Sequence, residues 1–194
     1  MTNVVLANLY LFVMAVVLAI LEIQIEGEHG WAKKLPTWRP HPDHPLAKIY
    51  AKIMSGKELT GYHGAMFIFV LLIFHLPYVF GLTFTFEHWL QTLSLFFIFI
   101  ALWDFLWFVL NPHFPLKNFA KDNPNHQAFF LGLPTDYYYS IAFSLVLSAV
   151  GQYLFGYQDF LYWWVINFSL FLIETFLTIG FAQYILDIDN WENK

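Results

Sequence analysis

Leu21-Glu22-Ile23-Gln24-Ile25-Glu26-Gly27 ends the first long apolar run of the chain. Glu22 and Glu26 are four residues apart, so a helix places both carboxylates on one face. An ionisable side chain inside a membrane span usually faces the interior of a helix bundle and marks a functional site or path. If other apolar segments carry polar residues at the same depth, this stretch lies beside a buried site.

The composition is that of an integral membrane protein. Of the 194 residues, 59 % are hydrophobic, 22 % are aromatic and 12 % are charged, and the mean hydropathy is +0.54. These values lie well outside the range that is found for a soluble domain of this size. The absence of cysteine excludes disulfides, thiolate nucleophiles, iron–sulfur clusters and Cys-type zinc sites. Nine Lys and Arg in a chain of net charge −5 exclude a nucleic-acid partner.

The apolar segments predict an all-α, polytopic membrane helix bundle that forms a single transmembrane domain. Five segments are long enough to cross about 30 Å of hydrocarbon, and they cover about 4–26, 62–82, 88–111, 136–156 and 159–186. The segment 28–60 is expected to lie at the membrane interface. Within it, apolar residues recur at helical spacing over 46–58 while Lys48, Lys52 and Lys57 take the other face. That pattern is typical of an amphipathic helix on anionic headgroups.

The basic residues predict the orientation of the bundle. All nine lie between the first and second spans, between the third and fourth, or in the C-terminal tail. Because Lys and Arg accumulate on the cytoplasmic side, the N-terminus is expected outside and the C-terminus in the cytoplasm of a multi-pass cell-membrane protein. Membrane lipids are the expected partners, and a homo-oligomer is left open.

Several polar side chains are expected at the depth of the opening stretch. His63 lies in the first turn of the second span, Asp104 lies near the cytoplasmic end of the third, and His126 lies in an apolar loop that is expected to fold back onto the bundle. The predicted metal-ligand set is Glu22, Glu26, His63, Asp104, His126 and Glu174. His113 is an alternate for His126, and Glu174 is alternatively an acceptor that orients a ligand histidine.

Two interpretations of these acids remain open. No Lys or Arg lies within a span, so the buried carboxylates are expected to have no cationic side-chain partner. In the first interpretation they bind one or two divalent ions, Fe, Mn or Zn, which the sequence does not distinguish. In the second they are protonated acids that hold helices together.

Two classes of function follow from these interpretations. In the first, a metal-dependent enzyme acts at the cytoplasmic leaflet on a lipid-like substrate. In the second, the acids form a path in a small proton- or cation-coupled transporter, or belong to a subunit of a membrane complex. Zinc-protease, nucleophile-elbow and phosphate-loop motifs are missing. The sequence therefore does not decide whether the protein is an enzyme.

Two runs carry a resemblance to known sequences. Glu22–Arg39 reads EIQIEGEHGWAKKLPTWR and Asp104–Pro112 reads DFLWFVLNP. They resemble an uncharacterised family of small prokaryotic polytopic membrane proteins. The resemblance implies a membrane helix bundle and transfers no activity.

Overall fold

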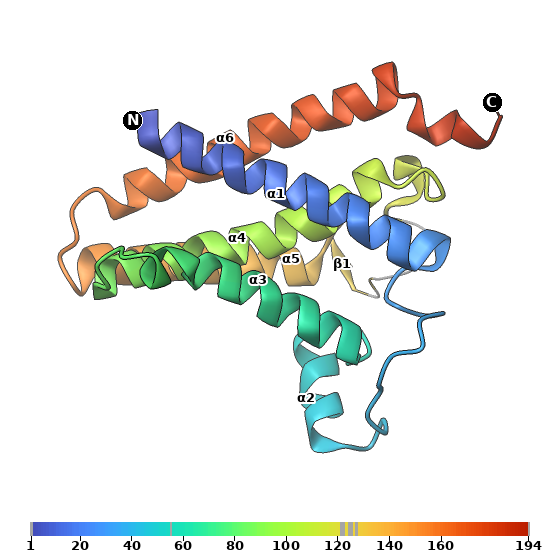
Figure 1. The fold of residues 1–194 in the computed structure, drawn as a ribbon, viewed down its shortest axis with the longest axis horizontal. Coiled ribbons are helices and arrows are strands. Elements are labelled where there is room, and N and C mark those ends of the chain that lie inside the picture. Colours follow the sequence, from blue (N-terminus) through green and yellow to red (C-terminus); the bar gives the residue numbers. More distant parts are fainter. Residues whose placement is uncertain (1, 55, 121–122, 124–125, 127, 194) are drawn as a thin grey trace.

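The fold is a bundle of long helices with one short helix standing apart (Figure 1). The computed structural model describes residues 2–54, 56–120, 123, 126 and 128–193. Its α-helices are α1 Thr2–Glu26, α2 Pro45–Ile53, α3 Gly61–Val79, α4 Phe86–Leu110, α5 Thr135–Tyr153 and α6 Phe160–Gly180. The short elements are β1 Phe129–Phe130, β2 Leu133–Pro134, a π-helical turn Phe181–Ile185, and the 3-10 turns Gly27–His29, Leu116–Asn118 and Ile188–Asn193. The two strands form one antiparallel pair of two residues each. All the longer elements are helices, so the predicted all-α class is confirmed.

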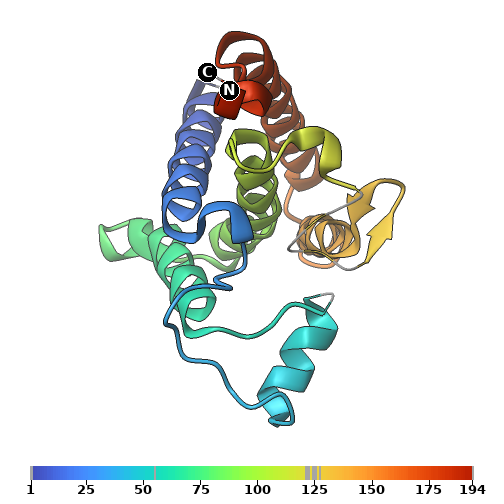
Figure 2. The same cartoon turned by 90° about the vertical axis from the view of Figure 1, so that its right-hand side faces the viewer.

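Helix α4 is the centre of the bundle. It packs against α1, α3, α5 and α6, and Figure 2 shows it surrounded by them. Its second half is almost entirely buried and contributes Phe99, Leu106, Trp107 and Phe108 to the core. A helix that is apolar on all sides is stable only when other helices or lipid cover it.

Four helical segments are long and apolar enough to cross a membrane. They are Val4–Glu26, Gly61–Val79, Phe86–Leu110 and Phe160–Asn190. Helix α5 has 19 residues, but it is less apolar because Asp136 and three tyrosines occupy its start and serines occupy its inward face. The fifth predicted span therefore stays a prediction. Large apolar side chains are exposed on the outer surface of the long helices, among them Leu6, Ile68, Leu72, Phe176 and Leu177, and such a surface is compatible with contact to a bilayer.

Small polar side chains join the helices away from the candidate site. Ser94 Oγ lies 2.8 Å from Ser144 Oγ, which also accepts a 2.8 Å hydrogen bond from Trp164 Nε1. Asn8 Nδ2 donates to Asn167 Oδ1 at 3.0 Å and thereby joins α1 to α6. Buried polar groups in an apolar bundle need such partners, because an unpaired one loses its hydrogen bonds to water without compensation.

The segment between α1 and α3 lies at one end of the bundle. Helix α1 ends at Glu26 because Gly27 adopts φ +64°, which glycine tolerates without strain. Helix α2 has no buried residue, and it lies outside the bundle in both views. The expected helix 46–58 is too long, since α2 ends at Ile53. Lys57 was expected on its headgroup face, but the structure buries this side chain at 2 % exposure.

Candidate metal site and adjoining cavity

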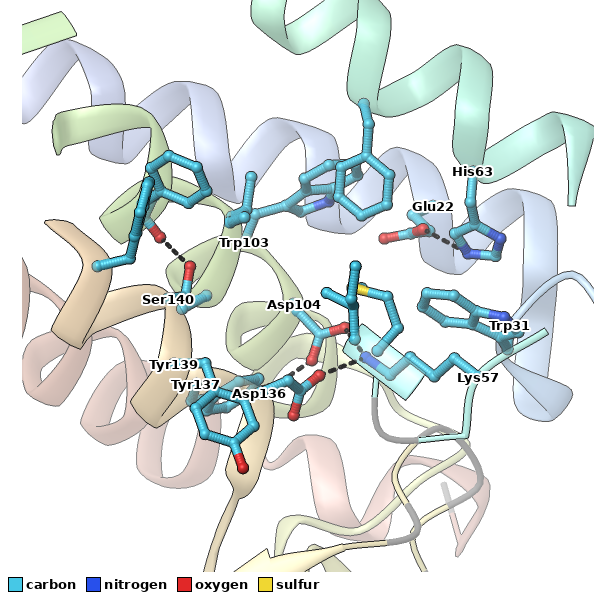
Figure 3. A pocket seen from close by; sticks show the side chains of 17 residues that line it. Glu22, Trp31, Lys57, His63, Trp103, Asp104, Asp136, Tyr137, Tyr139 and Ser140 are labelled. Carbon is cyan, nitrogen blue, oxygen red and sulfur yellow. Dashed lines mark hydrogen bonds and ion pairs between the residues drawn. The ribbon is translucent and has the colours of Figure 1, made fainter. Parts of the chain in front are cut away.

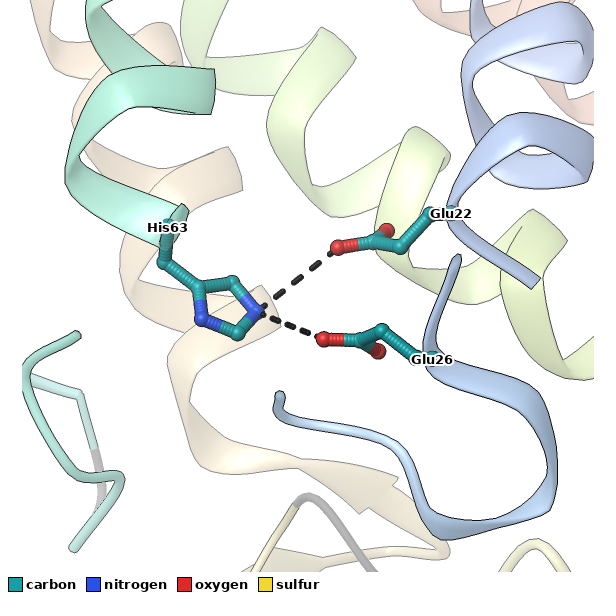
Figure 4. A group of neighbouring side chains, drawn as sticks. All are labelled: Glu22, Glu26 and His63. Carbon is teal, nitrogen blue, oxygen red and sulfur yellow. Dashed lines mark ion pairs between the residues drawn. The ribbon is translucent and has the colours of Figure 1, made fainter. Parts of the chain in front are cut away.

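Glu22 and Glu26 of α1 and His63 of α3 converge on one buried point (Figure 4). His63 Nε2 lies 3.3 Å from Glu26 Oε1 and 3.7 Å from Glu22 Oε1. One ligand atom from each residue lies within 4.8 Å of the others. Two ligands at about 2.1 Å from a tetrahedral ion are about 3.4 Å apart, so the His63 distances suit a shared ion. This group can hold a metal ion.

Thr60 sets the orientation of the His63 ring. Its hydroxyl caps α3 by accepting from the His63 backbone N–H at 3.2 Å, and it also lies 2.8 Å from His63 Nδ1. Trp31 stacks on the ring with 3.8 Å between centroids. The remaining nitrogen, Nε2, is buried and has no hydrogen-bond partner within the described structure. A metal ligand histidine needs this arrangement, with one nitrogen held by a partner and the other free for the ion.

A strained turn after α1 completes the surroundings of the group. The backbone N–H of Ala32 donates to Glu26 Oε1 at 2.6 Å. Trp31 and Ala32 both have positive φ angles, +45° and +52°, and such a conformation costs about 1–3 kcal/mol for each non-glycine residue. The turn places the Trp31 ring over His63 and directs an N–H group to Glu26. Strain of this kind persists where the surrounding contacts require it, as at binding sites.

A second polar cluster lies on the other side of Trp31 (Figure 3). Lys57 Nζ is 3.4 Å from Asp104 Oδ1 and 3.0 Å from Asp136 Oδ2. It also lies 4.5 Å from the centroid of the Trp31 ring, a cation–π distance. The expectation that the buried acids have no cationic side-chain partner is therefore wrong for Asp104. The cation comes from the connecting segment, not from a span.

His126 bridges the two carboxylates of this cluster. Its Nε2 lies 2.8 Å from Asp104 Oδ2 and its Nδ1 lies 3.1 Å from Asp136 Oδ1. The Tyr137 hydroxyl also donates to Asp104 Oδ2. Burial lowers the pKa of His126, but the two carboxylates outweigh burial and the net pKa is raised. Both nitrogens face carboxylates, and the protonated form of the ring donates a hydrogen bond on each side.

The structure divides the six predicted ligands into separate places. Glu22, Glu26 and His63 come together, whereas Asp104 and His126 belong to the Lys57 cluster. Glu174 lies on α6 and lines neither place, although its Oε2 is buried without a hydrogen-bond partner in the described part of the chain. His113, the alternate, is exposed. Metal binding by Asp104, His126 and Glu174 stays a prediction to which this arrangement lends no support.

Three side chains of the site were not predicted from sequence. Trp31 reads as an interfacial tryptophan and Lys57 as a headgroup-facing lysine, because local sequence gives no sign that the segment turns inward. Asp136 reads as a helix N-cap, but the N-cap position of α5 is Pro134. The only sequence feature that could have indicated the place of Asp136 in the site is its position just inside the start of a helix, next to a loop that was expected to fold back onto the bundle.

A cavity of about 520 Å³ joins the two polar groups. Glu22 and His63 face it from one side, and Lys57, Asp104 and Asp136 face it from the other (Figure 3). The rest of its lining is mostly apolar and comes from α2, α3, α4 and α5, with Ile53, Met54, Phe67, Phe97, Ile100, Ala101, Trp103 and Phe143. It is an apolar chamber with charged groups at one end, the usual form of a small-molecule site.

No protein-family model, curated protein or solved structure matches this chain. No relative of known activity therefore adds to the resemblance that Glu22–Arg39 and Asp104–Pro112 carry. The function has to be inferred from the residues and their geometry.

Proposed function

We propose that this protein is a multi-pass membrane metalloenzyme that acts on a lipid-like substrate in the 520 Å³ cavity. The observation that carries the proposal is that Glu22 and His63 belong both to the candidate metal group and to the cavity wall. Three protein ligands leave at least one coordination position for substrate or water, as catalytic sites require. When bound, such an ion polarises a substrate oxygen or activates a water molecule.

The charges around the cavity support one divalent ion. Four carboxylates, those of Glu22, Glu26, Asp104 and Asp136, face two cations, Lys57 and His126. With all of these groups ionised, the sum is −2. Uncompensated charge in an apolar bundle is strongly unfavourable, so a divalent ion at the Glu22, Glu26, His63 group balances the site. Two oxygen ligands and one imidazole suit Fe, Mn or Zn.

The membrane setting of the proposal rests on the apolar helices and on the basic residues. We place the N-terminus outside and the C-terminus in the cytoplasm, because the exposed basic side chains gather in the loops of one side. The candidate metal group then lies near the cytoplasmic leaflet, where α1 ends and α3 begins. A lipid-like substrate would reach it without leaving the bilayer.

A transporter path is less well supported. A path needs titratable or hydrated groups through the full thickness of the bundle. Outside the two polar clusters, Asn8 bonds to Asn167 and Ser94 bonds to Ser144, and none of these four side chains is titratable. Glu174 of α6 is titratable, but its buried Oε2 has no hydrogen bond to either cluster or to these pairs among the described residues. A chain of proton carriers across the bundle is therefore not visible among the described residues.

Metal analysis of the detergent-purified protein tests the proposal. We expect about one divalent ion per chain, with loss of that ion in Glu22→Gln and in His63→Ala, and retention in the matched control Glu87→Gln on the outer turn of α4. Thermal stability should fall with metal removal in the wild type and not in His63→Ala. Equal metal content in all four proteins would rule out this site. Enzymatic action is then tested by lipid mass spectrometry, comparing a membrane lipid extract incubated with wild type or with His63→Ala.

A further inference from the structure

The charges of the cavity specify the kind of head group that it accepts. Lys57 is the only Lys or Arg of the described residues that lines it. Its ammonium group has three N–H donors. Asp104 Oδ1 and Asp136 Oδ2 lie at 3.4 and 3.0 Å from it, and the centroid of the Trp31 ring lies at 4.5 Å. The charge of Lys57 is therefore already matched by two carboxylates and covered by an aromatic ring, which leaves it a poor partner for a phosphate or carboxylate of a ligand.

Three carboxylates also line the cavity, those of Glu22, Asp104 and Asp136. Like charges brought together in a low-dielectric site repel one another strongly. An anionic head group placed at the polar end would meet these carboxylates and a lysine whose charge they already balance. A divalent ion at the Glu22, Glu26 and His63 group brings the sum of charges to zero, so an anionic head group would leave uncompensated negative charge in that state as well. An uncharged hydroxyl or carbonyl oxygen meets no such repulsion and can reach the Glu22 and His63 side.

The apolar part of the cavity limits the size of the ligand. Its volume of about 520 Å³ lies within the range of about 300–1,000 Å³ that is usual for small-molecule sites. A site of this size suits one hydrocarbon chain with a small head group. Phe67, Phe97 and Phe143 provide walls for such a chain.

We infer that the cavity selects a single-chain amphiphile with an uncharged polar head group. This inference deepens the proposed function by naming its substrate class, and it rests on that function only for the chemical step. Binding of the amphiphile depends on the cavity and on the Lys57 cluster. The inference is therefore testable with and without metal.

Quenching of tryptophan fluorescence by brominated lipids measures occupancy, since Trp31 and Trp103 border the cavity. A brominated monoacylglycerol and the matching brominated lysophosphatidate differ only by a phosphate, and a brominated phosphatidylcholine reports bulk lipid. Ala101→Phe places a large side chain in the cavity, so the quenching that remains in this variant comes from tryptophans outside the cavity. That quenching is subtracted as background from the quenching of the wild type. Ala65→Phe, on the exposed face of α3, is the matched control that should leave quenching unchanged. We expect the monoacylglycerol to bind at least about tenfold more tightly than the lysophosphatidate.

Asp136→Asn tests the charge argument with a gain of binding. It removes one negative charge beside Lys57 and keeps the shape of the side chain, so the lysophosphatidate should bind more tightly while the monoacylglycerol changes little. Equal binding of the two matched probes, equal quenching by phosphatidylcholine, or no difference between wild type and Ala101→Phe would overturn the inference. Measurement in chelator and in added Zn²⁺ separates the two proposals, because a failed metal site leaves chain binding intact.

Discussion

Lys57 connects the segment before α3 to α4 and α5 through two carboxylates. Its side chain is almost fully buried, so Lys57→Met would leave Asp104 and Asp136 without their cation. Breaking a buried ion pair from one side destabilises a protein by about 3–5 kcal/mol. We expect a loss of this size in reversible unfolding in mixed micelles. Lys52→Met, at an exposed position of α2, should change stability by less than about 0.5 kcal/mol, and equal effects of both variants would contradict the assignment.

Thr60 acts on the candidate metal group through His63. Thr60→Val keeps the shape of the side chain but removes the hydroxyl that lies 2.8 Å from His63 Nδ1. Loss of a partner that orients a metal ligand lowers metal affinity by about 10–100-fold. Titration with Co²⁺ or Zn²⁺ should show this loss, and Thr60→Ser should recover most of the affinity. If Thr60→Val binds metal as the wild type does, His63 is held by other contacts.

His126 gives the protein a pH dependence with a definite sign. Its pKa in the folded protein is raised above the ordinary value of 6.5 by Asp104 and Asp136, despite the opposing effect of burial. A raised pKa adds stability that is fully present below about pH 6.5 and is lost as the pH rises through the folded value. The unfolding free energy of wild type relative to His126→Gln should therefore fall over that range. A flat difference between pH 6 and 9 would show that the ring does not carry the charge.

At the scale of elements, α2 is predicted to lie on the membrane surface. Leu46, Ile49 and Ile53 are all more than half exposed and share one face, while Lys48 and Lys52 are on the other. A bimane probe at Ile49→Cys in the full chain should be quenched by lipid-borne quenchers in anionic vesicles. Because each charge near the surface is worth about 1 kcal/mol, Lys48→Glu with Lys52→Glu should weaken that quenching. Unchanged quenching would make α2 a solvated connector.

The elements show which parts of the fold the sequence could predict. The length of the apolar runs placed the end of the first span at residue 26, where α1 ends, and the start of the second at about residue 62, next to Gly61 where α3 begins. These are local properties of helices, so they can be read locally. The inward turn that brings Trp31 and Lys57 beside His63 and Asp104 depends on contacts between distant segments. Glu22, Glu26 and His63 were predictable because the end of α1 and the start of α3 lie at the same end of the bundle. The place of Asp136 beside Lys57 depends on the fold of the loop before α5, which local sequence does not give.

At the scale of the whole molecule, the orientation in the membrane decides which side the candidate site serves. The chain has no cysteine, so single cysteines can be introduced without background. Lys34 is exposed in the segment after α1, and Phe155 is exposed in the connection between α5 and α6, at the other end of the bundle. With the N-terminus outside, Lys34→Cys should react with an impermeant maleimide only after the cells are opened, and Phe155→Cys should react in intact cells. The second label also tests whether α5 spans the membrane, since five spans put the two positions on opposite sides.

The reverse labelling pattern would place the candidate metal group and the polar end of the cavity at the outer leaflet. A substrate would then come from that leaflet, while the contacts among Glu22, Glu26 and His63 would stay unchanged.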